Sequence, residues 1–235
     1  MRHSGVSGFV ALLAAGLLAA TGWLGAAELK VGAASPADRL EPAKGVFLIA
    51  RRELPDPNFS HSVVFLLRHD DEGTLGVIVN RQTSVGLAEA IPQVGGVSGT
   101  PHRLSLGGPV STDRVSFLLR DTQPVAAGEH VIDDIYFGLD RRLLERLLQA
   151  GKPESELKVF AGYSSWAGGQ LAREVARGDW HLATVDPRII FCGGGNSLWK
   201  TLIDRYDPIG ILVWSDPSSP WCPWDRTQGT GGRPG

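Results

Sequence analysis

The sequence predicts an α/β fold, in the α+β sense of a mixed β-sheet with helices packed against it, formed by a single domain. Strand and hairpin signals come early in the chain, and strand and helix signals alternate later, which is the order expected of such a sheet. Hydrophobic residues make up 43% and charged residues 20% of the 235 residues, enough apolar material to bury a normal core. A domain usually takes roughly 100–200 residues, and no linker is evident inside 45–215, so we expect one domain there.

The N-terminal part of the chain is expected to lie outside this domain. Residues 9–27 contain no charged residue, follow Arg2 and end in small residues, which is the pattern of a signal peptide cleaved before Glu28. An uncleaved inner-membrane anchor is an alternative, because the segment approaches the ~20 apolar residues that span a bilayer; a translation start further along the chain is another. The first two place the domain outside the cytoplasm, in the periplasm or secreted. Residues 28–44 are small, polar and broken by proline, so they predict a flexible tether.

The first strands include a predicted β-hairpin. Residues 45–50 are a short apolar run, and residues 62–68 are a second run, rich in residues that favour strands. Turn residues at 69–73 separate this second run from a third at 75–80. The second and third runs therefore predict the hairpin.

Later apolar runs predict further strands, and the end of the chain predicts a tail. The predicted strands are 103–106, 115–120, 131–137, 157–163, 180–185 and 209–214. Gly107-Gly108-Pro109 is a turn signal that separates the first two of these strands. Residues 216–235 are rich in Pro, Gly, Ser and Trp and predict a mostly disordered tail.

Helix signals lie between these strands. Ser84 is expected to cap a short helix that ends before Pro92. Asp140 is a typical N-cap for a helix whose leucines recur at helical spacing up to Gly151. The predicted helices that follow are 166–177, ending at Gly178, a single turn from Asp186-Pro187 to Phe191, and a helix capped by Asn196 or Ser197 that ends at Arg205.

Charge and cysteine content disfavour several kinds of site. The formal net charge is −2, so the chain has no basic field for a nucleic-acid backbone, and nucleic acid is not an expected partner. Cys192 and Cys222 either form a disulfide in an oxidising compartment or remain two unrelated thiols. They lack the CxxC spacing of a zinc site, and we expect no metal and no cofactor. The acidic run 69–72 is expected to be a solvated hairpin tip.

Several motifs, in order along the chain, resemble the YqgE/AlgH family, also called UPF0301 or DUF179. They are Phe47-Leu-Ile-Ala50, Leu54, Asp56-Pro-Asn-Phe59, Ser62-Val-Val64, His69, Gly73, Gly76-Val-Ile-Val-Asn80, Gly107-Gly-Pro109, Asp113-Arg114, Gly162-Tyr-Ser-Ser-Trp166, Gly169-Gln-Leu171, Glu174 and Gly178-Asp-Trp180. The resemblance implies a mixed, partly barrel-like β-sheet surrounded by helices. It implies no agreed biochemical activity, only a proposed regulatory role in exopolysaccharide production. The export segment departs from the family pattern, since its members look cytoplasmic.

The segment Gly162-Tyr-Ser-Ser-Trp166 is the most site-like part of the sequence. It is predicted to join a strand to a helix, where backbone N–H groups and hydroxyls can bind an anion or a small ligand. The candidate ligand-binding residues are Ser164, Ser165, Trp166, Gln170, Gly107, Gly108, Asn80 and Arg81. The structural alternative is that a serine caps the helix, that Tyr163 and Trp166 pack against the sheet, and that the two glycines form a tight turn. A G-x-S-x-G hydrolase elbow would need Gly in place of Trp166.

These observations favour an exported binding or regulatory module without enzymatic activity, and no catalytic residue is assigned. An envelope protein or a polysaccharide is the expected partner, and membrane contact is expected only through residues 9–27 if they are not cleaved. One alternative is a hydrolase or redox enzyme that uses the 162–170 cleft or the two cysteines. A transcriptional regulator is another, although the net charge and the export segment count against it.

Overall fold

The computed structural model describes residues 40–192 and 195–207. Its strands are β1 Phe47–Ala50, β2 Val63–Asp70, β3 Gly73–Ile78, β4 Gln82–Gly86, β5 Arg103–Leu106, β6 Val110–Arg120, β7 Glu129–Ile132, β8 Ile135–Gly138, β9 Leu157–Ala167 and β10 Trp180–Ala183. Its helices are α1 Leu87–Ala90, α2 Arg141–Gln149, α3 Gln170–Arg177, the 3₁₀ helix η2 Pro187–Cys192 and α4 Gly195–Tyr206.

The described strands form one mixed sheet. Its path is β10-β1-β2-β3-β9-β6-β8-β7, and β5 pairs with both β9 and β4. The pairing of β5 with β9 is parallel, whereas the other pairings are antiparallel. The mixed sheet with helices against it is therefore confirmed. Because β10 and β7 end the path without pairing to each other, the sheet is not closed into a barrel.

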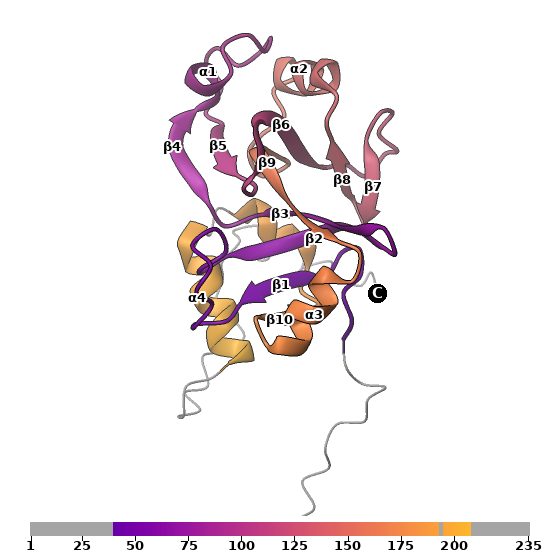
Figure 1. The fold of residues 1–235 in the computed structure, drawn as a ribbon. Helices are drawn as coiled ribbons and strands as arrows, with labels where there is room; N and C mark the ends of the chain where they lie inside the picture. The colour runs from indigo at the N-terminus through magenta and orange to yellow at the C-terminus, as the bar shows by residue number, and fades with distance from the viewer. Residues whose placement is uncertain (1–39, 193–194, 208–235) are drawn as a thin grey trace, which may run out of the picture. The chain divides into compact units, whose positions relative to one another are not determined.

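Strand β9 connects two halves of this sheet. Its last residues pair with β3, and its first residues pair with β6 and β5. Figure 1 shows α1 and α2 with β4 to β8 in the upper half, and α3 and α4 with β1, β2 and β10 in the lower half. The strand bends between its two parts at Gly162, whose φ is +69°. A Cβ there would lie 2.6 Å from the carbonyl oxygen of Gly108, so only glycine fits this bend.

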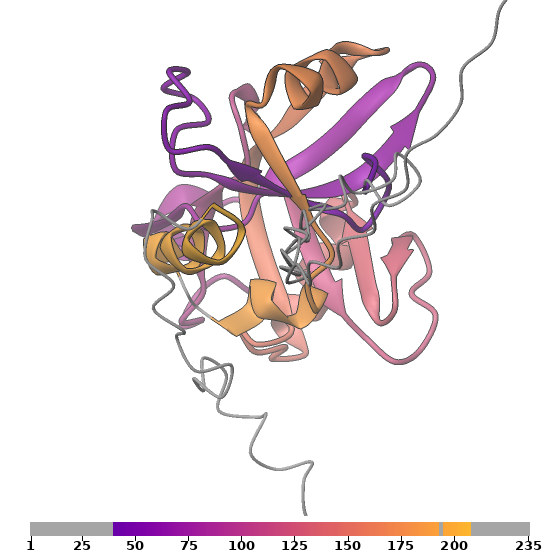
Figure 2. The same ribbon diagram turned by 90° about the horizontal axis from the view of Figure 1, so that it is seen from below.

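The hydrophobic core has three parts, which follow from the alternation of side chains along the strands. In the lower half, Phe47 and Phe65 face a cluster that includes residues of α4, whereas Leu48 and Val64 face a cluster that includes Leu171 of α3. Successive side chains of a strand point to opposite faces, so α3 and α4 cover opposite faces of β1 and β2, as Figure 2 shows from below.

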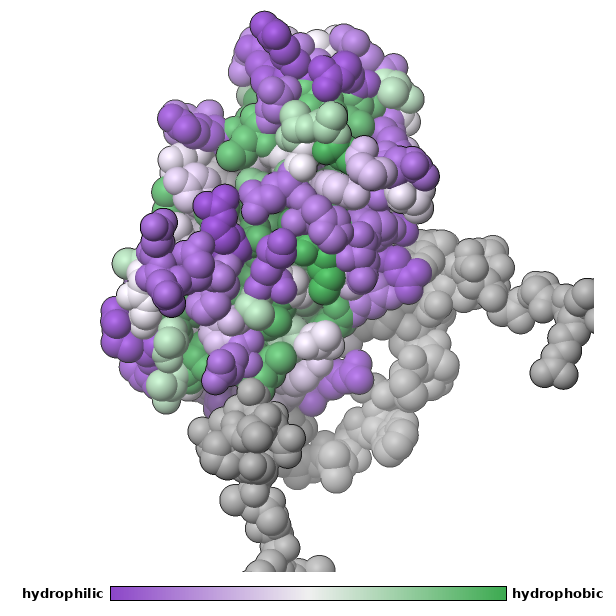
Figure 3. Space-filling view, turned by 90° about the vertical axis from the view of Figure 1, so that its right-hand side faces the viewer, coloured by the Kyte–Doolittle hydropathy of each residue, from purple (hydrophilic) through white to green (hydrophobic). Residues whose placement is uncertain are grey.

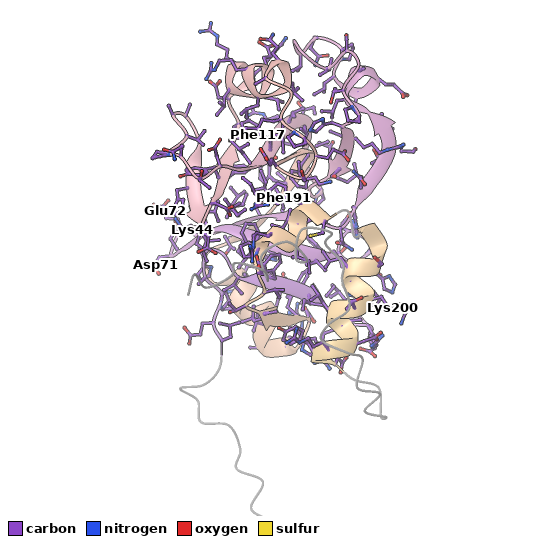
Figure 4. All side chains as sticks on the ribbon, turned by 180° about the vertical axis from the view of Figure 1, so that it is seen from behind. Lys44, Asp71, Glu72, Phe117, Phe191 and Lys200 are labelled. Atoms are coloured by element: carbon purple, nitrogen blue, oxygen red, sulfur yellow. The ribbon has the colours of Figure 1, made fainter. Side chains whose placement is uncertain are left out.

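The third part of the core lies in the upper half, between α1, α2 and the β6–β9 region. Phe117 of β6 belongs to it, and Phe191 of η2 belongs to the cluster that also contains α4 residues. Figure 4 shows Phe117 in the upper half and Phe191 closer to the middle. Each helix is thus fixed to the sheet by buried apolar side chains, which supply most of a helix's stability in a protein.

Several predicted elements are confirmed. Strands β2 and β3 form the predicted hairpin, whose tip carries the exposed Asp71 and Glu72 (Figure 4). The Asp140 carboxylate accepts a hydrogen bond from the backbone N–H of Leu143 at 2.6 Å, so it caps α2 as predicted. Gly178 ends α3 in the left-handed conformation, with φ +88°, as expected of a C-terminal glycine.

Other predicted boundaries are wrong. Ser84 does not cap a helix, because it lies in β4, which pairs with β5, and α1 begins only after Gly86. The predicted strand 131–137 is split into β7 and β8 by a turn in which Asp133 has φ +48°, a conformation that aspartate tolerates better than most residues.

Five predictions fall wholly or partly on residues outside the described part of the chain. They are the signal peptide or anchor at 9–27, the tether at 28–44, of which 28–39 are not described, the final strand at 209–214, the tail at 216–235 and the Cys192–Cys222 disulfide, because Cys222 is not described. They stay predictions. Among residues 40–192 and 195–207, no helix has the length and apolar character needed to cross a membrane.

Candidate functional site

A small cavity lies between three segments that are far apart in the sequence. Its volume is about 230 Å³. The loop after β1 forms one wall, the end of β9 forms another, and α3 with the start of β10 forms the third. The lining residues are Leu54, Pro55, Asp56, Phe59, Ser165, Trp166, Gln170, Glu174, Arg177, Asp179 and Trp180. We call this cavity the tryptophan pocket.

The Glu174 carboxylate accepts three hydrogen bonds within the tryptophan pocket. Its Oε2 accepts hydrogen bonds from the indole N–H of Trp166 at 2.9 Å and of Trp180 at 3.0 Å. Its Oε1 accepts a third bond from the Gln170 amide at 3.0 Å. Three donors therefore fix the position of one carboxylate without neutralising its charge, because none of these donors is cationic.

Helix spacing places these groups on one side of α3. Gln170 and Glu174 are four residues apart, and Arg177 follows three residues later, so all three side chains lie on neighbouring turns of the same face. Helix α3 begins only after Gly169, whose φ is +69° and which makes no side-chain cap. The Gln170 side chain also accepts a hydrogen bond from the backbone N–H of Ala167 at 3.1 Å, which ties the start of the helix to the end of β9.

Three aromatic rings pack against one another at the base of the tryptophan pocket. The Phe59 ring is stacked on Trp166 with centroids 5.5 Å apart, and it meets Trp180 edge-on at 5.5 Å. The two indoles are 6.1 Å apart with their planes at 82°. Trp166 is 3% and Trp180 4% exposed, so the rings hold the three walls together and offer little open surface. Such edge and offset contacts are the favourable aromatic geometries.

The lining of the tryptophan pocket is acidic. It contains the carboxylates of Asp56, Glu174 and Asp179 and one cation, Arg177. Arg177 donates a hydrogen bond to Asp179, and this bond raises the pKa of the guanidinium above its ordinary value. The Arg177 side chain is 62% exposed, so this pair lies at the mouth of the cavity. The formal charge of the lining is negative.

The loop that forms the first wall is held by two residues at the end of β3. Arg81 donates to the carbonyl oxygens of Asn58 at 2.7 Å and Ser60 at 2.9 Å. Asn80 donates to the carbonyl oxygen of His61 at 2.9 Å, and its own oxygen accepts from the backbone N–H of Val63 at 2.8 Å. Burial lowers the pKa of Arg81 below its ordinary value, while the negative charge of Asp56 acts in the opposite direction.

The structure separates the predicted ligand-binding residues into three groups. Ser165, Trp166 and Gln170 line the tryptophan pocket. Asn80 and Arg81 do not line it, although they hold the loop that does. Ser164, Gly107 and Gly108 lie elsewhere, at the crossing of β9 with the chain between β5 and β6.

Backbone crowding explains the third group. Ser164 is fully buried, and its hydroxyl donates to the carbonyl oxygen of Gly107 at 3.2 Å. A Cβ on Gly107 would lie 2.4 Å from the carbonyl oxygen of Gly162, and one on Gly108 would lie 2.2 Å from that of Tyr163. Two glycines are therefore needed for this close passage of main chains.

The predicted helix start at Trp166 is wrong. Residues from Ser164 to Ala167 continue β9, because they pair with Gly73 to Gly76 of β3. Neither serine caps α3, and their backbone groups lie in a sheet rather than at a helix N-terminus. The strand-to-helix junction on which the anion-binding prediction depended is thus displaced to Gly168 and Gly169.

Sequence reasoning about the site missed Asp56, Phe59, Glu174, Asp179 and Trp180. All five belong to motifs that carry the family resemblance, in the segments 56–59, 174 and 178–180. That convergence of separate motifs was the one signal that could have indicated a shared site. Neither spacing nor composition brings a residue near 59 and a residue near 180 together.

A second cavity, of about 340 Å³, is lined by Arg120, Asp133, Asp134, Asp186, Pro187 and Arg188. Arg120 pairs with Asp134 at 2.9 Å, and Arg188 pairs with Asp186. Both of its arginines are thus engaged with carboxylates of the same lining. Within the described residues, no group of three or more His, Cys, Asp or Glu side chains is arranged to hold a metal ion.

Comparison with known proteins gives a consistent result. The family model described as AlgH-like, DUF179, matches residues 47–208. A UPF0301 protein of Chlorobium luteolum is 34% identical over 180 residues, covering 76% of this chain and 93% of the relative. A UPF0301 protein of Mycobacteroides abscessus is 34% identical over 190 residues, covering 77% of this chain and 87% of the relative.

Two solved structures are similar to this one. A crystal structure of a Corynebacterium diphtheriae protein aligns with a TM-score of 0.60 at 26% identity, covering 76% of this chain and 94% of that chain. The solution structure of the AlgH protein from Pseudomonas aeruginosa aligns with a TM-score of 0.58 at 26% identity, covering 74% of this chain and 93% of that chain. The residues matched by the family model include all three walls of the tryptophan pocket.

Proposed function

This chain belongs to the AlgH-like family, DUF179, also called UPF0301, and we propose that it is an exported binding module without enzymatic activity that recognises a protein partner through the tryptophan pocket. The export part of the proposal depends on the uncharged segment 9–27. The binding part depends on the geometry of the pocket.

The position of the Glu174 carboxylate is the observation that supports this function. Hydrogen bonds from neutral donors hold this carboxylate in place and leave its negative charge available to a charged group of a partner. Here two nearly buried indoles and an amide aim the carboxylate at a cavity. A cavity into which a few polar groups converge is the default candidate for a binding site.

The cavity is small for a metabolite or cofactor. Sites for drug-sized molecules usually measure roughly 300–1,000 Å³, whereas the tryptophan pocket measures about 230 Å³. A cavity of this size suits one side chain presented by a larger partner. An envelope protein is the partner class that fits both this size and the predicted export.

The geometry around Ser164 argues against the hydrolase alternative. A nucleophilic serine needs a base within hydrogen-bond reach and access to substrate. The Ser164 hydroxyl instead donates to the Gly107 carbonyl oxygen and is fully buried. A Ser164→Ala variant is therefore expected to change no activity of the protein, and a purified protein that loses turnover of a defined substrate on this change would contradict the proposal.

A site-specific crosslinking experiment tests the proposed function. A photo-reactive amino acid is placed at Ser165, which is exposed at the tryptophan pocket, and in a second variant at Glu89, an exposed residue of α1 in the other half of the sheet. Illumination of living cells should give a discrete adduct of higher mass only for position 165. An adduct from both positions, or from neither, would show that the tryptophan pocket is not the binding site of a partner.

A further inference from the structure

We propose that the tryptophan pocket receives a basic side chain, the ammonium of a lysine or the guanidinium of an arginine, from the partner protein. This inference rests on the proposed function, because it names the group that the same pocket binds. The lining of the cavity, its negative charge and the cation that already lies at its mouth support it.

The two kinds of lining residue match the two parts of a basic side chain. Leu54, Pro55 and Phe59 supply apolar surface along the loop wall, and the carboxylates of Asp56, Glu174 and Asp179 supply charge. Lysine and arginine side chains have an apolar stem and a charged end, and they bury the stem along apolar surface while the charged end meets a polar group. A purely apolar side chain would displace water from the Glu174 carboxylate, whose hydrogen-bond donors are neutral, without offering it an opposite charge.

Arg177 shows that the site accepts a cation. Its side chain belongs to the same lining, pairs with Asp179, and feels the charge of Glu174, which also raises the pKa of Arg177. Glu174 itself accepts hydrogen bonds from the neutral donors Trp166, Gln170 and Trp180. A second cation can therefore approach Glu174 and Asp56, while Arg177 opposes it by like-charge repulsion and by holding Asp179.

Two other ligand classes fit less well. A sugar ring stacks on an open aromatic face, but Trp166 and Trp180 are 3% and 4% exposed and Phe59 lies against both of them. A quaternary ammonium needs open ring faces turned toward one empty centre, whereas the two indoles meet edge to face at 82° and are almost completely buried. Recognition of the cation is thus assigned to the carboxylates rather than to the rings.

The NMR signals of the indole N–H groups can report the binding of a cation to Glu174. Those of Trp166 and Trp180 donate to the Glu174 carboxylate, whereas that of Trp199, which does not line the tryptophan pocket, donates to the carbonyl oxygen of Ala50 at 2.8 Å. In a ¹⁵N-labelled protein, each indole gives its own NMR signal. A cation that binds Glu174 should shift the first two signals and leave the third in place.

The experiment titrates the labelled protein with N-acetyl-lysine methylamide and N-acetyl-arginine methylamide. N-acetyl-norleucine methylamide is the control probe, because it has the lysine stem without the charge. We expect saturable shifts with dissociation constants on the order of 1 mM for the charged probes, as suits a single side chain, and weaker binding at high salt. Equal shifts with the norleucine probe would overturn the basic-side-chain proposal.

Two substitutions with opposite expected effects make the test specific. Glu174→Gln keeps an oxygen for the indole N–H groups but removes the charge, and should weaken lysine-probe binding by roughly tenfold. Arg177→Gln removes the exposed competing cation and should strengthen binding several-fold. Glu89→Gln, on an exposed residue of α1, is the matched control and should leave binding unchanged. Unchanged affinity in both pocket variants would contradict the proposal, and the Trp199 signal reports whether each variant is folded.

The two proposals fail in different ways. If the crosslink at position 165 forms but charged and uncharged probes bind alike, or none binds, the module still binds a partner and only the basic side chain is wrong. If the crosslink is absent and no probe shifts the indole signals, both proposals are wrong.

Discussion

At the scale of the residue, Glu174 connects the stability of the site with its chemistry. One carboxylate oxygen accepts from two indoles whose rings are almost completely buried. If the carboxylate is removed, two N–H groups lose their acceptor in a place where water has little access. A buried donor without a partner costs about 1–3 kcal/mol.

Glu174→Ala should therefore lower the free energy of unfolding by about 2–4 kcal/mol. Glu174→Gln should cost less, because its amide oxygen can occupy the Oε2 position and keep both indole bonds. Chemical denaturation followed by circular dichroism measures the two differences. Glu89→Ala, at an exposed position, should stay within about 0.5 kcal/mol of the parent. Equal losses for Ala and Gln at position 174 would mean that the indole bonds contribute nothing.

Gly108 is a residue whose role is steric. Its φ is +153°, and a Cβ would lie 2.2 Å from the carbonyl oxygen of Tyr163 and 2.5 Å from the Ser164 hydroxyl. The obstacle is main chain of β9, which is paired on both sides and cannot move without breaking ladder bonds. This explains a glycine pair that the sequence alone presented as a turn or as a ligand contact.

Gly108→Ala should destabilise the protein by more than about 3 kcal/mol or prevent folding, because overpacking against fixed main chain falls in the severe class of substitutions. Gly86→Ala is the matched control, since no atom lies within 4 Å of the Cβ that it would add and its φ is −73°. The measurement is the midpoint of thermal unfolding for both variants. A soluble Gly108→Ala protein with the parent's midpoint would show that β9 can shift.

At the scale of the element, the loop after β1 is the wall of the tryptophan pocket with the least secondary structure. Its conformation depends on the side chains of Asn80 and Arg81, which hold three of its carbonyl oxygens. His61 in this loop has φ +55°, a costly conformation for a non-glycine residue. The end of β3 therefore decides where Asp56 and Phe59 lie, although it does not line the pocket.

Arg81→Ala should loosen this loop without unfolding the sheet. Amide hydrogen exchange is expected to speed up at Phe59 and Ser60, whose N–H groups bond to the Asp56 carbonyl oxygen, and to stay slow in β1 and β2. Arg68→Ala is the control, because the Arg68 side chain forms an exposed pair with Glu129, a kind of pair that contributes about 0–1 kcal/mol. Unchanged exchange at Phe59 would show that Asn80 suffices to hold the loop.

The exposed face of the molecule also bears on the kind of partner. Figure 3 shows one side on which hydrophilic residues cover most of the surface and hydrophobic areas are small and interrupted. Interfaces of this composition depend on a few well-placed anchors rather than on a broad apolar area. A single basic side chain seated in the tryptophan pocket would be such an anchor.

At the scale of the whole molecule, buried histidines should make stability depend on pH. Burial lowers the pKa values of His102 and His181 below the ordinary 6.5. The folded protein therefore resists protonation at these residues, while the unfolded chain takes up protons near pH 6.5. Stability from these groups is complete above pH 6.5 and is lost as the pH falls toward the lowered values.

We expect the free energy of unfolding to decrease between about pH 7.5 and 5.5. Asp186 beside Arg188 and Asp204 beside Arg52 are carboxylates whose pKa values are lowered from an ordinary 3.8. They affect the free energy of unfolding only in a separate, more acidic pH range. His102→Gln should reduce the pH dependence of the free energy of unfolding between about pH 7.5 and 5.5 and leave it unchanged in the more acidic range. Denaturation curves recorded at each pH measure the free energy of unfolding. An unaltered pH dependence in His102→Gln would show that His102 does not contribute to it.

Much of this architecture could be predicted because its signals are local. The β2–β3 hairpin follows from two strand-favouring runs around turn residues, the start of α2 follows from the Asp140 cap, and the end of α3 follows from Gly178. Each involves groups only a few residues apart, so the sequence itself brings them together. The ordered motifs also identified the family, which the comparison confirms.

Tertiary structure decided the site. Trp166 was predicted to begin a helix, but pairing with Thr74 of β3 keeps it in a strand, because ladder bonds across the sheet outweigh a helix preference that begins nearby. Glu174 looked like an ordinary helical residue until Trp166 and Trp180 were placed on either side of it. Contacts between distant segments depend on how the sheet folds back on itself, and no spacing along the chain records which segments will meet.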